Sequence, residues 1–256
     1  RFIKPKMQNC FGPFIHFELI LYSLLMTNTL LKLNHAIIKC KKCKRLVKFR
    51  NKIATEKRKQ YMNENYWGKP ITGYGDPKAQ LLMVGLAPAA HGGNRTGRVF
   101  TGDKSADFLF NCLHKAQLAN QSNSDHRNDG LKLYNIYLTA ALKCVPPGDK
   151  PTSLELKTCF SFFKKEISIL SGINTIVALG KIAFDACLNF YKEDYLIKNK
   201  DFVFSHGCKY KLPDNKILVG SYHPSPRNVN TGRIDTKKMV NLLEEVKKII
   251  KDNKWQ

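Results

Sequence analysis

Four short apolar runs, separated by longer helical patterns, constrain the fold of this 256-residue chain more than any other feature. The runs are residues 81–85, 134–142, 175–179 and 217–222, each followed by turn chemistry. Helical patterns lie near residues 105–119, 153–170, 181–190 and 235–251. This alternation predicts a parallel sheet with helices on both faces. We therefore predict an α/β protein: a three-layer α/β/α sandwich with a four-stranded parallel central sheet.

The N-terminal 38 residues differ from the rest of the chain. Their apolar run at residues 19–26 is too short to span a bilayer, so no membrane partner is predicted. We predict that residues 1–38 are an extension of unknown role and that residues 39–256 form one domain. An amphipathic helix, an organellar transit segment and an upstream over-read of the gene all remain open for the extension. A cytoplasmic monomer is expected.

The charge balance favours a polyanionic partner. Lys and Arg number 43 against 20 Asp and Glu, for a net charge of +23. Residues 40–69 alone carry 11 Lys and Arg against 2 Glu, a net charge of +9, in a pattern that suits a helix. Such a one-sided surface predicts contact with nucleic-acid phosphates, although a charge run is often only a solvated face.

Four of the eight cysteines suggest a metal or redox centre. Cys40 and Cys43 have the spacing with which two thiolates chelate one centre, Cys144 follows the second apolar run, and Cys159 lies on the next predicted helix. Four thiolates suit either a structural zinc ion or an iron–sulfur cluster, and spacing does not separate them. Buried free cysteines with a chance pair are the third interpretation.

Two polar segments follow predicted strands. Residues 85–103 form a glycine-rich turn that is neither a Walker loop nor a dinucleotide fingerprint, and whose backbone N–H groups can approach a ligand. Arg95 and Arg98 add positive charge there, and Phe100 adds a flat face on which a base can stack. His223 stands at the end of the fourth run, with prolines at 224 and 226. In a parallel sheet both segments reach the edge where ligands bind.

Together these segments resemble the uracil-DNA glycosylase superfamily, and most closely its B-type branch, often called the fifth family. The resemblance covers about residues 40–250. The motifs that carry it are CKKCKRL from Cys40, YWGKPITGYGDP from Tyr66, GLAPAAHGGNRTGRVFTGD from Gly85, HRNDGLKL from His126, LKCVPPGDKPT from Leu142 and HPSPRN from His223. It implies a DNA-repair enzyme that flips uracil out of double- or single-stranded DNA and hydrolyses its glycosidic bond.

The resemblance also implies roles for particular residues. A structural [4Fe–4S] cluster would be held by Cys40, Cys43, Cys144 and Cys159. His223 would donate toward the departing base, and Asp103 or Asn94 would orient water. The implied base-binding residues are Gly85, Ala87, Ala89, His91, Phe100, Ala140, Asp149 and Asn228, and the implied DNA contacts are Arg95, Arg98 and Arg227.

Departures from the family pattern bear on specificity. Ala87 replaces an acid or amide that related branches use to position water. Ala140 replaces an amide that reads uracil, so hypoxanthine or xanthine are expected as further substrates. Asp149 stands where B-type relatives usually have Asn. Ala87 and Asp149 support a second interpretation, a cluster-bearing protein that binds lesions without turnover. A zinc-bearing α/β hydrolase or RNA-processing factor is the third interpretation, and it is disfavoured because no nucleophile motif is present.

Overall fold

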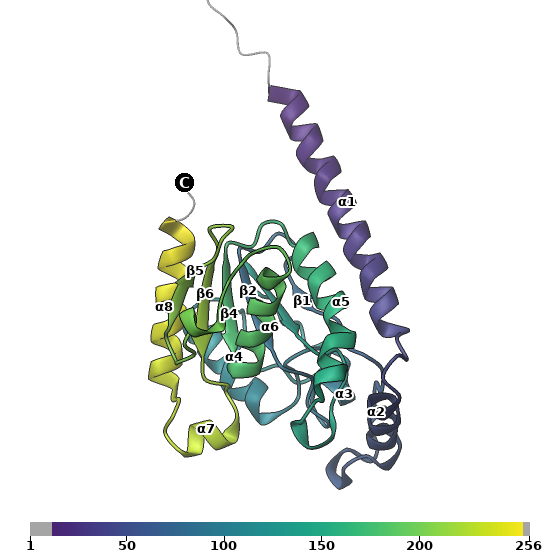
Figure 1. Ribbon diagram of the computed structural model, residues 1–256. Helices are drawn as coiled ribbons and strands as arrows, with labels where there is room; N and C mark the ends of the chain where they lie inside the picture. The colour runs from purple at the N-terminus through teal and green to yellow at the C-terminus, as the bar shows by residue number, and fades with distance from the viewer. Residues whose placement is uncertain (1–11, 253–256) are drawn as a thin grey trace, which may run out of the picture.

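The computed structural model describes residues 12–252, and its centre is a sheet whose four middle strands are parallel (Figure 1). They are β2 (Leu81–Gly85), β3 (Ile136–Ala140), β4 (Thr175–Leu179) and β6 (Ile217–Ser221). Almost every residue in them is buried, which explains why each strand is a continuous apolar run in the sequence. The predicted four-stranded parallel core is confirmed.

Two short edge strands extend the sheet beyond the prediction. β1 (Tyr74–Gly75) pairs antiparallel with β3, and β5 (Lys209–Lys211) pairs antiparallel with β6. The strand order is therefore β1-β3-β2-β4-β6-β5. Both edge strands lie outside the core, contain two and three residues, and have no apolar run that would reveal them in the sequence.

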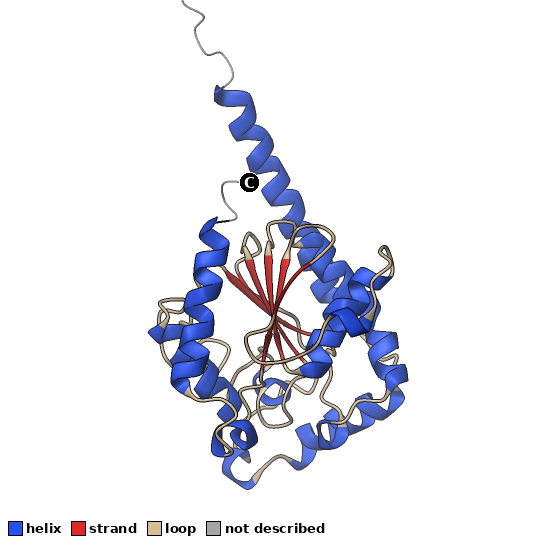
Figure 2. Cartoon of the chain, turned by 60° about the vertical axis from the view of Figure 1, so that its left-hand side comes forward, coloured by secondary structure: helices blue, strands red, loops and turns tan. Residues whose placement is uncertain are grey.

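Helices cover both faces of the sheet, which is seen nearly edge-on in Figure 2. α4 (Lys104–Lys115) and α8 (Thr236–Asp252) pack on one face against strand residues that include Met83 and Val177. α1 (Gly12–Ile38), α5 (Ser153–Ile169) and α6 (Lys181–Lys192) pack on the other face against neighbours such as Leu82 and Ile176. Successive strand residues point to opposite faces, so each apolar run contributes to both cores. The predicted α/β/α sandwich is confirmed.

Most of the shorter elements lie beyond the carboxyl ends of the parallel strands. They are α2 (Lys44–Glu56), η1 (Lys59–Tyr61), α3 (Gly93–Thr96), η2 (Pro147–Asp149) and α7 (Pro226–Asn230), whereas η3 (Asn199–Asp201) belongs to the connection between α6 and β5. α2, α3 and α7 are at the lower end of Figure 1. The sheet thus presents its loops at the edge where ligands bind in parallel α/β folds.

The N-terminal extension is helical in its described part. The last turns of α1 bury Leu30, Leu33 and Ile37 in the core layer that contains α5. The start of the helix projects past the rest of the molecule (Figure 1), and residues 1–11 lie outside the described part. Within residues 12–252, no helix has both the length and the apolar character that crossing a bilayer requires. The division of the chain after residue 38 stays a prediction.

A buried ion pair joins the end of β3 to α5. Lys143 Nζ lies 2.6 Å from Glu166 Oε2, and the two side chains are 2% and 0% exposed. The same carboxylate oxygen accepts a hydrogen bond from Thr139 Oγ1, and Oε1 accepts from the Gly73 N–H and the Tyr137 hydroxyl. Both charges are therefore desolvated but fully compensated.

Removing either charge should be costly. We expect Lys143→Met or Glu166→Gln to lower the free energy of unfolding by about 3–5 kcal/mol, because each leaves a buried charge without its partner. The double variant Lys143→Met/Glu166→Gln should recover a large part of that loss, because neither charge is then left without its partner. Urea unfolding of the single and double variants measures the coupling. Losses that simply add would show that the two charges do not depend on each other.

Candidate active site and four-cysteine site

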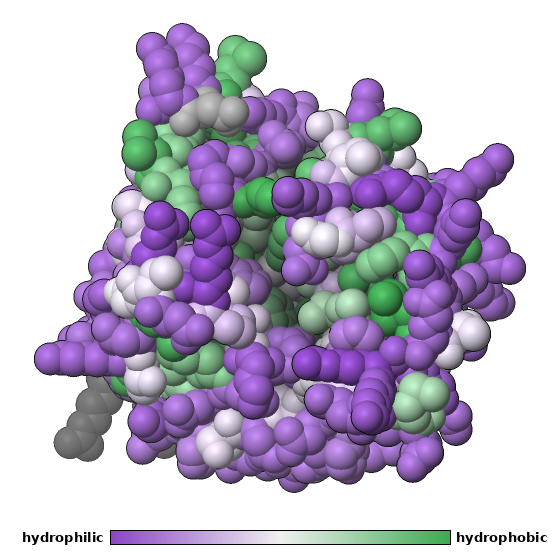
Figure 3. All heavy atoms as spheres, turned by 90° about the horizontal axis from the view of Figure 1, so that it is seen from below, coloured by the Kyte–Doolittle hydropathy of each residue, from purple (hydrophilic) through white to green (hydrophobic). Residues whose placement is uncertain are grey.

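An open pocket lies at the carboxyl edge of the parallel sheet. Figure 3 views this end of the molecule and shows a hollow with a largely hydrophilic rim. Residues from the glycine-rich segment, the start of α4, the η1 region, η2 and α7 line it: Arg58, Gln60, Tyr61, Glu64, Ala89, Ala90, His91, Gly92, Arg95, Gly102, Asp103, Lys104, Ser105, Asp107, Asp125, His126, Asp149 and Pro226. Of the predicted site residues, Ala89, His91, Arg95, Asp103 and Asp149 are therefore brought together.

His223 is fixed by its own segment. Ser225 begins α7 as its N-cap, with its hydroxyl accepting a bond from the Asn228 N–H. The Asn228 side-chain amide donates to the His223 carbonyl oxygen at 2.9 Å, and the Ser225 N–H donates to the same oxygen at 2.8 Å. Asn228 therefore holds the histidine backbone.

The charge state of His223 follows from its surroundings. Burial lowers the pKa of the imidazole from its ordinary value of 6.5, and the nearby Asp149 carboxylate opposes that change. Asp149 itself is exposed and adopts the left-handed backbone conformation, with φ of 57°. An imidazole that is neutral near pH 7 can donate one hydrogen bond without carrying a charge into the pocket.

Phe100 is positioned by the absence of a side chain at Gly85. A Cβ atom at Gly85 would lie 2.5 Å from Cζ of the Phe100 ring, so only glycine admits the ring there. Phe100 adopts φ of 48°, which is uncommon for a residue with a side chain. Gly85 is in register with Ala140 on β3, so Phe100, Gly85 and Ala140 come together where β2 and β3 end.

Asp103 caps the helix that begins beside the pocket. Its Oδ1 accepts hydrogen bonds from the Ser105 and Ala106 N–H groups at 2.9 and 3.1 Å. Its Oδ2 lies against Gly92, where a Cβ atom would come within 2.1 Å of that oxygen. Burial raises the pKa of the Asp103 carboxyl above its ordinary value. In residues 12–252 no donor is directed at Oδ2, which leaves that oxygen available to a ligand.

Asn94 lies away from the pocket. Its side chain is 1% exposed, and its amide donates to the carbonyl oxygen of Arg50 on α2 at 3.3 Å. The backbone carbonyl of Asn94 accepts a bond from the Gly68 N–H. The contacts of Asn94 are therefore those of a residue that joins the glycine-rich segment to its neighbours.

Arg95 and Arg98 are buried and occupied. Arg95 pairs with Glu64 at 2.5 Å and donates to the carbonyl oxygens of His91 and Gly102. The five hydrogen bonds of Arg98 go to Asp129, Ser124, Thr101 and the Arg127 carbonyl oxygen. The two guanidinium groups hold the glycine-rich segment in place. Their predicted contact with DNA gains no support from these positions, whereas Arg227 is exposed on α7.

His91 has a partner that the sequence reasoning did not single out. Tyr66 Oη lies 2.9 Å from His91 Nδ1, and it also accepts a bond from the Arg58 N–H. Burial, followed by the charges of Arg58 and Arg95, lowers the pKa of His91. Tyr66 begins one of the motifs that carry the family resemblance, and this was the only indication in the sequence that it lies near the site. Its role as a hydrogen-bond partner required the fold.

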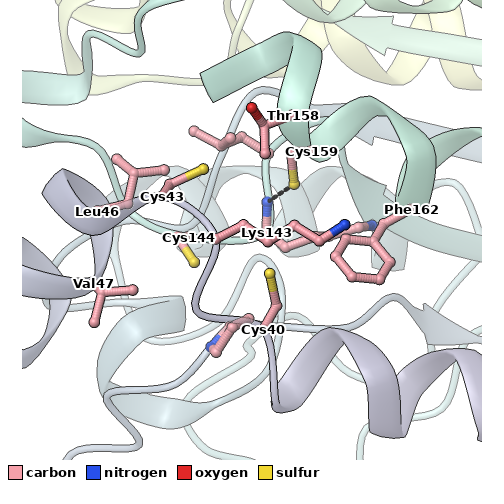
Figure 4. A pocket seen from close by; sticks show the side chains of 12 residues that line it. Cys40, Cys43, Leu46, Val47, Lys143, Cys144, Thr158, Cys159 and Phe162 are labelled. Atoms are coloured by element: carbon pink, nitrogen blue, oxygen red, sulfur yellow. Dashed lines mark hydrogen bonds between the residues drawn. The ribbon is translucent and has the colours of Figure 1, made fainter. Parts of the chain in front are cut away.

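The four predicted cysteines surround one small pocket. Cys40 and Cys43 come from the segment between α1 and α2, Cys144 from the loop after β3, and Cys159 from α5. Figure 4 shows their sulfur atoms turned toward a common space. In residues 12–252 no group of three or more His, Cys, Asp and Glu side chains has the spacing of a preformed ion site. Ala87 packs beside this cluster, outside the larger pocket.

Burial and hydrogen bonds distinguish the four thiols. Burial raises the pKa of Cys144 to about 11 and that of Cys159 to about 12. The Lys143 N–H donates to Cys159 Sγ at 3.3 Å, and Arg50 Nη1 donates to Cys144 Sγ at 3.1 Å. These donors favour sulfur atoms that carry negative charge. The donor set therefore fits a group that binds thiolates.

Comparison with known proteins agrees with this architecture. The model of the uracil DNA glycosylase superfamily matches residues 72–247, and the chain belongs to that superfamily. Within it, the chain is 42% identical to the type-5 uracil-DNA glycosylase of Thermus thermophilus, over 82% of this chain and 93% of that protein. It is 41% identical to the type-5 enzyme of Mycobacterium tuberculosis, over 85% of this chain and 81% of that protein. For the type-5 enzyme of Pyrobaculum aerophilum the identity is 39%, over 81% of this chain and 87% of that protein.

Proposed function

We propose that this chain hydrolyses the N-glycosidic bond of uracil in DNA and so begins base-excision repair. The observation that carries the proposal is the arrangement of the His223 segment, Asp149 and the glycine-rich segment at one edge of the sheet. Similarity to type-5 uracil-DNA glycosylases supports it. When uracil leaves, negative charge develops on the base and positive charge on the sugar. The site must therefore stabilise an anion, hold a flipped base and admit water.

His223 and Phe100 are the residues assigned to bind the departing base. A neutral His223 donates toward a base oxygen, where negative charge grows during bond cleavage. Backbone N–H groups of the turn at 85–93, which includes Ala89 and His91, add further donors. The ring of Phe100 stacks on the base. Asn228 acts through His223 and is a positioning residue.

The stacking role of Phe100 can be tested at Gly85. Gly85→Ala should displace the ring and lower kcat/KM for uracil by about 5–150-fold, which corresponds to about 1–3 kcal/mol of base stacking. The measurement is steady-state excision by the variants Gly85→Ala, Phe100→Ala and the double variant. Since both single changes remove the same contact, the double variant should be no worse than Phe100→Ala. Multiplying losses would contradict the assignment.

Orientation of water is assigned to Asp103. Its Oδ1 is occupied by the α4 N–H groups, whereas Oδ2 has no donor in the described part of the chain. That oxygen can accept a hydrogen bond from water. Asn94, the other candidate, uses its amide on Arg50. The proposal therefore rests on Asp103 alone for this step.

The cysteine site is assigned to a structural [4Fe–4S] cluster. Such a cluster requires four thiolates. Three separate segments of the chain supply them here, from Cys40, Cys43, Cys144 and Cys159. When bound, the cluster would cross-link these segments and supply no step of hydrolysis. Its anchors are next to α2, η2 and α5, so it would order the segment that carries Asp149.

DNA contact is assigned to exposed cations near this edge. Lys44, Lys48 and Lys52 are exposed along α2, and Arg227 is exposed at α7. Their charges suit the phosphates that flank a flipped nucleotide. Arg95 and Arg98 are not included, because carboxylates already pair with both.

The experiment that tests the function is excision from a panel of oligonucleotides. Duplex and single strands carrying uracil, hypoxanthine or xanthine are incubated with protein of known iron content, and alkali reveals abasic sites. Release of uracil supports the proposal. Release of the purines as well would support the broad specificity that Ala87 and Ala140 suggest. Tight lesion binding without release of any base overturns the proposal in favour of a lesion-binding protein.

The pH dependence of excision should report His223. Because burial lowers its pKa below the ordinary value of 6.5, the imidazole is neutral at pH 7 and gains a positive charge only at lower pH. The single-turnover rate should stay level from about pH 8 to 6.5 and then change as that charge enters the pocket. Asp149→Asn removes a charge that raises the pKa, so the change should move to lower pH. An unmoved profile in this variant would show that another group limits the rate.

A further inference from the structure

Arg50 is a buried cation whose charge has no carboxylate partner in the described part of the chain. It lies on α2 with 4% of its surface exposed. Nη1 donates to Cys144 Sγ at 3.1 Å, and Nη2 donates to the Cys40 carbonyl oxygen at 3.2 Å. Its guanidinium therefore contacts two of the four cysteine positions. The other described arginines of low exposure, Arg95 and Arg98, each pair with a carboxylate.

The third nitrogen of the guanidinium is unsatisfied. Arg50 Nε is buried and has no hydrogen-bond partner in residues 12–252. Burying a charge without a counter-ion is costly, and an unpaired buried N–H adds to that cost. A neutral thiol at Cys144 offers only weak compensation. A thiolate that is part of a negatively charged group would supply the counter-charge that the guanidinium lacks.

We propose that Arg50 is the internal counter-ion of the group held by the four cysteines. This inference rests on the cluster proposed above. Arg50 is a positioning residue: it donates to the Cys144 thiolate, retains the bound group and raises its reduction potential. The potential rises because the reduced cluster carries one more negative charge than the oxidised one, so a nearby cation stabilises the reduced state more.

The backbone of Arg50 extends this contact toward the pocket. Its carbonyl oxygen accepts the hydrogen bond from Asn94 in the glycine-rich segment. One residue thus contacts the cysteine site through its side chain and the base-binding segment through its main chain. This arrangement gives Asn94 a purpose that does not involve water.

Two variants and one control test the proposal in the full chain. Arg50→Met removes charge and donors, whereas Arg50→Lys keeps the charge and loses the fork of three nitrogens. Lys48→Met is the control, because it removes one exposed positive charge from the same helix. Iron content, iron release to a chelator and the reduction potential by voltammetry are measured for each protein.

Arg50→Met should release iron about 10–100-fold faster than the unaltered protein and shift its potential to a more negative value. The iron-release rate and the potential of Arg50→Lys should lie between those of Arg50→Met and those of the unaltered protein. If Arg50→Met does not fold, Arg50→Lys alone tests the proposal. Lys48→Met should match the unaltered protein in iron content, iron release and reduction potential. An unchanged potential and release rate in Arg50→Lys and Arg50→Met would overturn the role of Arg50. Failure of the underlying cluster proposal is separately visible, because the unaltered protein would then contain no iron.

Discussion

His223→Ala should lower the single-turnover rate of uracil release by about 10²–10⁴-fold, which is the range for loss of a positioned acid–base group or charge-stabilising donor. The loss should be in the chemical step, because the role proposed for His223 is to donate where negative charge grows on the base. Binding to DNA with an abasic site should change little. The fold should be kept, since His223 follows β6 in the loop that leads to α7.

A control separates catalysis from general damage to the protein. His35→Ala alters an exposed histidine on α1 that does not line the pocket, and the variant should excise uracil at the unaltered rate. Rapid-quench measurements with excess enzyme give the rate without contributions from product release. A His223→Ala protein that keeps its rate would remove this residue from the catalytic site.

Cys43→Ser should lose iron and, with it, much of the protein's stability. The proposed cluster would be held only by the folded chain, so its binding free energy would add directly to the free energy of folding. A loss of even about 3 kcal/mol lowers Tm by roughly 6–12 °C for a chain of this size. Excision should fall as a consequence of disorder near the cysteine site, even with His223 unaltered.

Cys208→Ser is the matched control for the cysteine. Cys208 is half-buried next to Gly220, and it lies outside the four-cysteine pocket. Its replacement should leave iron content and Tm close to those of the unaltered protein. Iron analysis, visible absorbance and thermal unfolding followed by circular dichroism give the comparison. Full iron content in Cys43→Ser would refute the ligand assignment.

The sheet was predictable from the sequence because parallel strands that are buried on both faces consist of unbroken apolar runs. The run at 175–179 matches β4 residue for residue. β1 and β5 were missed because edge strands need only a few backbone hydrogen bonds and little apolar surface. The four cysteines could be grouped from their spacing and the family resemblance, and the fold does bring them to one pocket.

The partners of the buried arginines could not be predicted. Glu64 and Asp129 are each 31 residues from the arginine they bind, and nothing in a single sequence links such positions. Arg95 and Arg98 therefore looked like free cations beside a ligand. Asn94 looked like a polar group in a site, whereas its amide is used on the backbone of α2. In each case the residue type could be read from the sequence, whereas the partner that uses its charge or amide could not.

The pairing of Arg95 and Arg98 with carboxylates has a consequence for how the protein responds to salt. A phosphate contact strengthens binding by releasing condensed counterions, and the number of such contacts sets how steeply affinity falls as salt rises. Two arginines whose charges already face carboxylates should add little to this release of counterions. Although they lie in the segment that approaches the base, the salt sensitivity of the complex should be governed by exposed lysines on α2, at the periphery of the footprint.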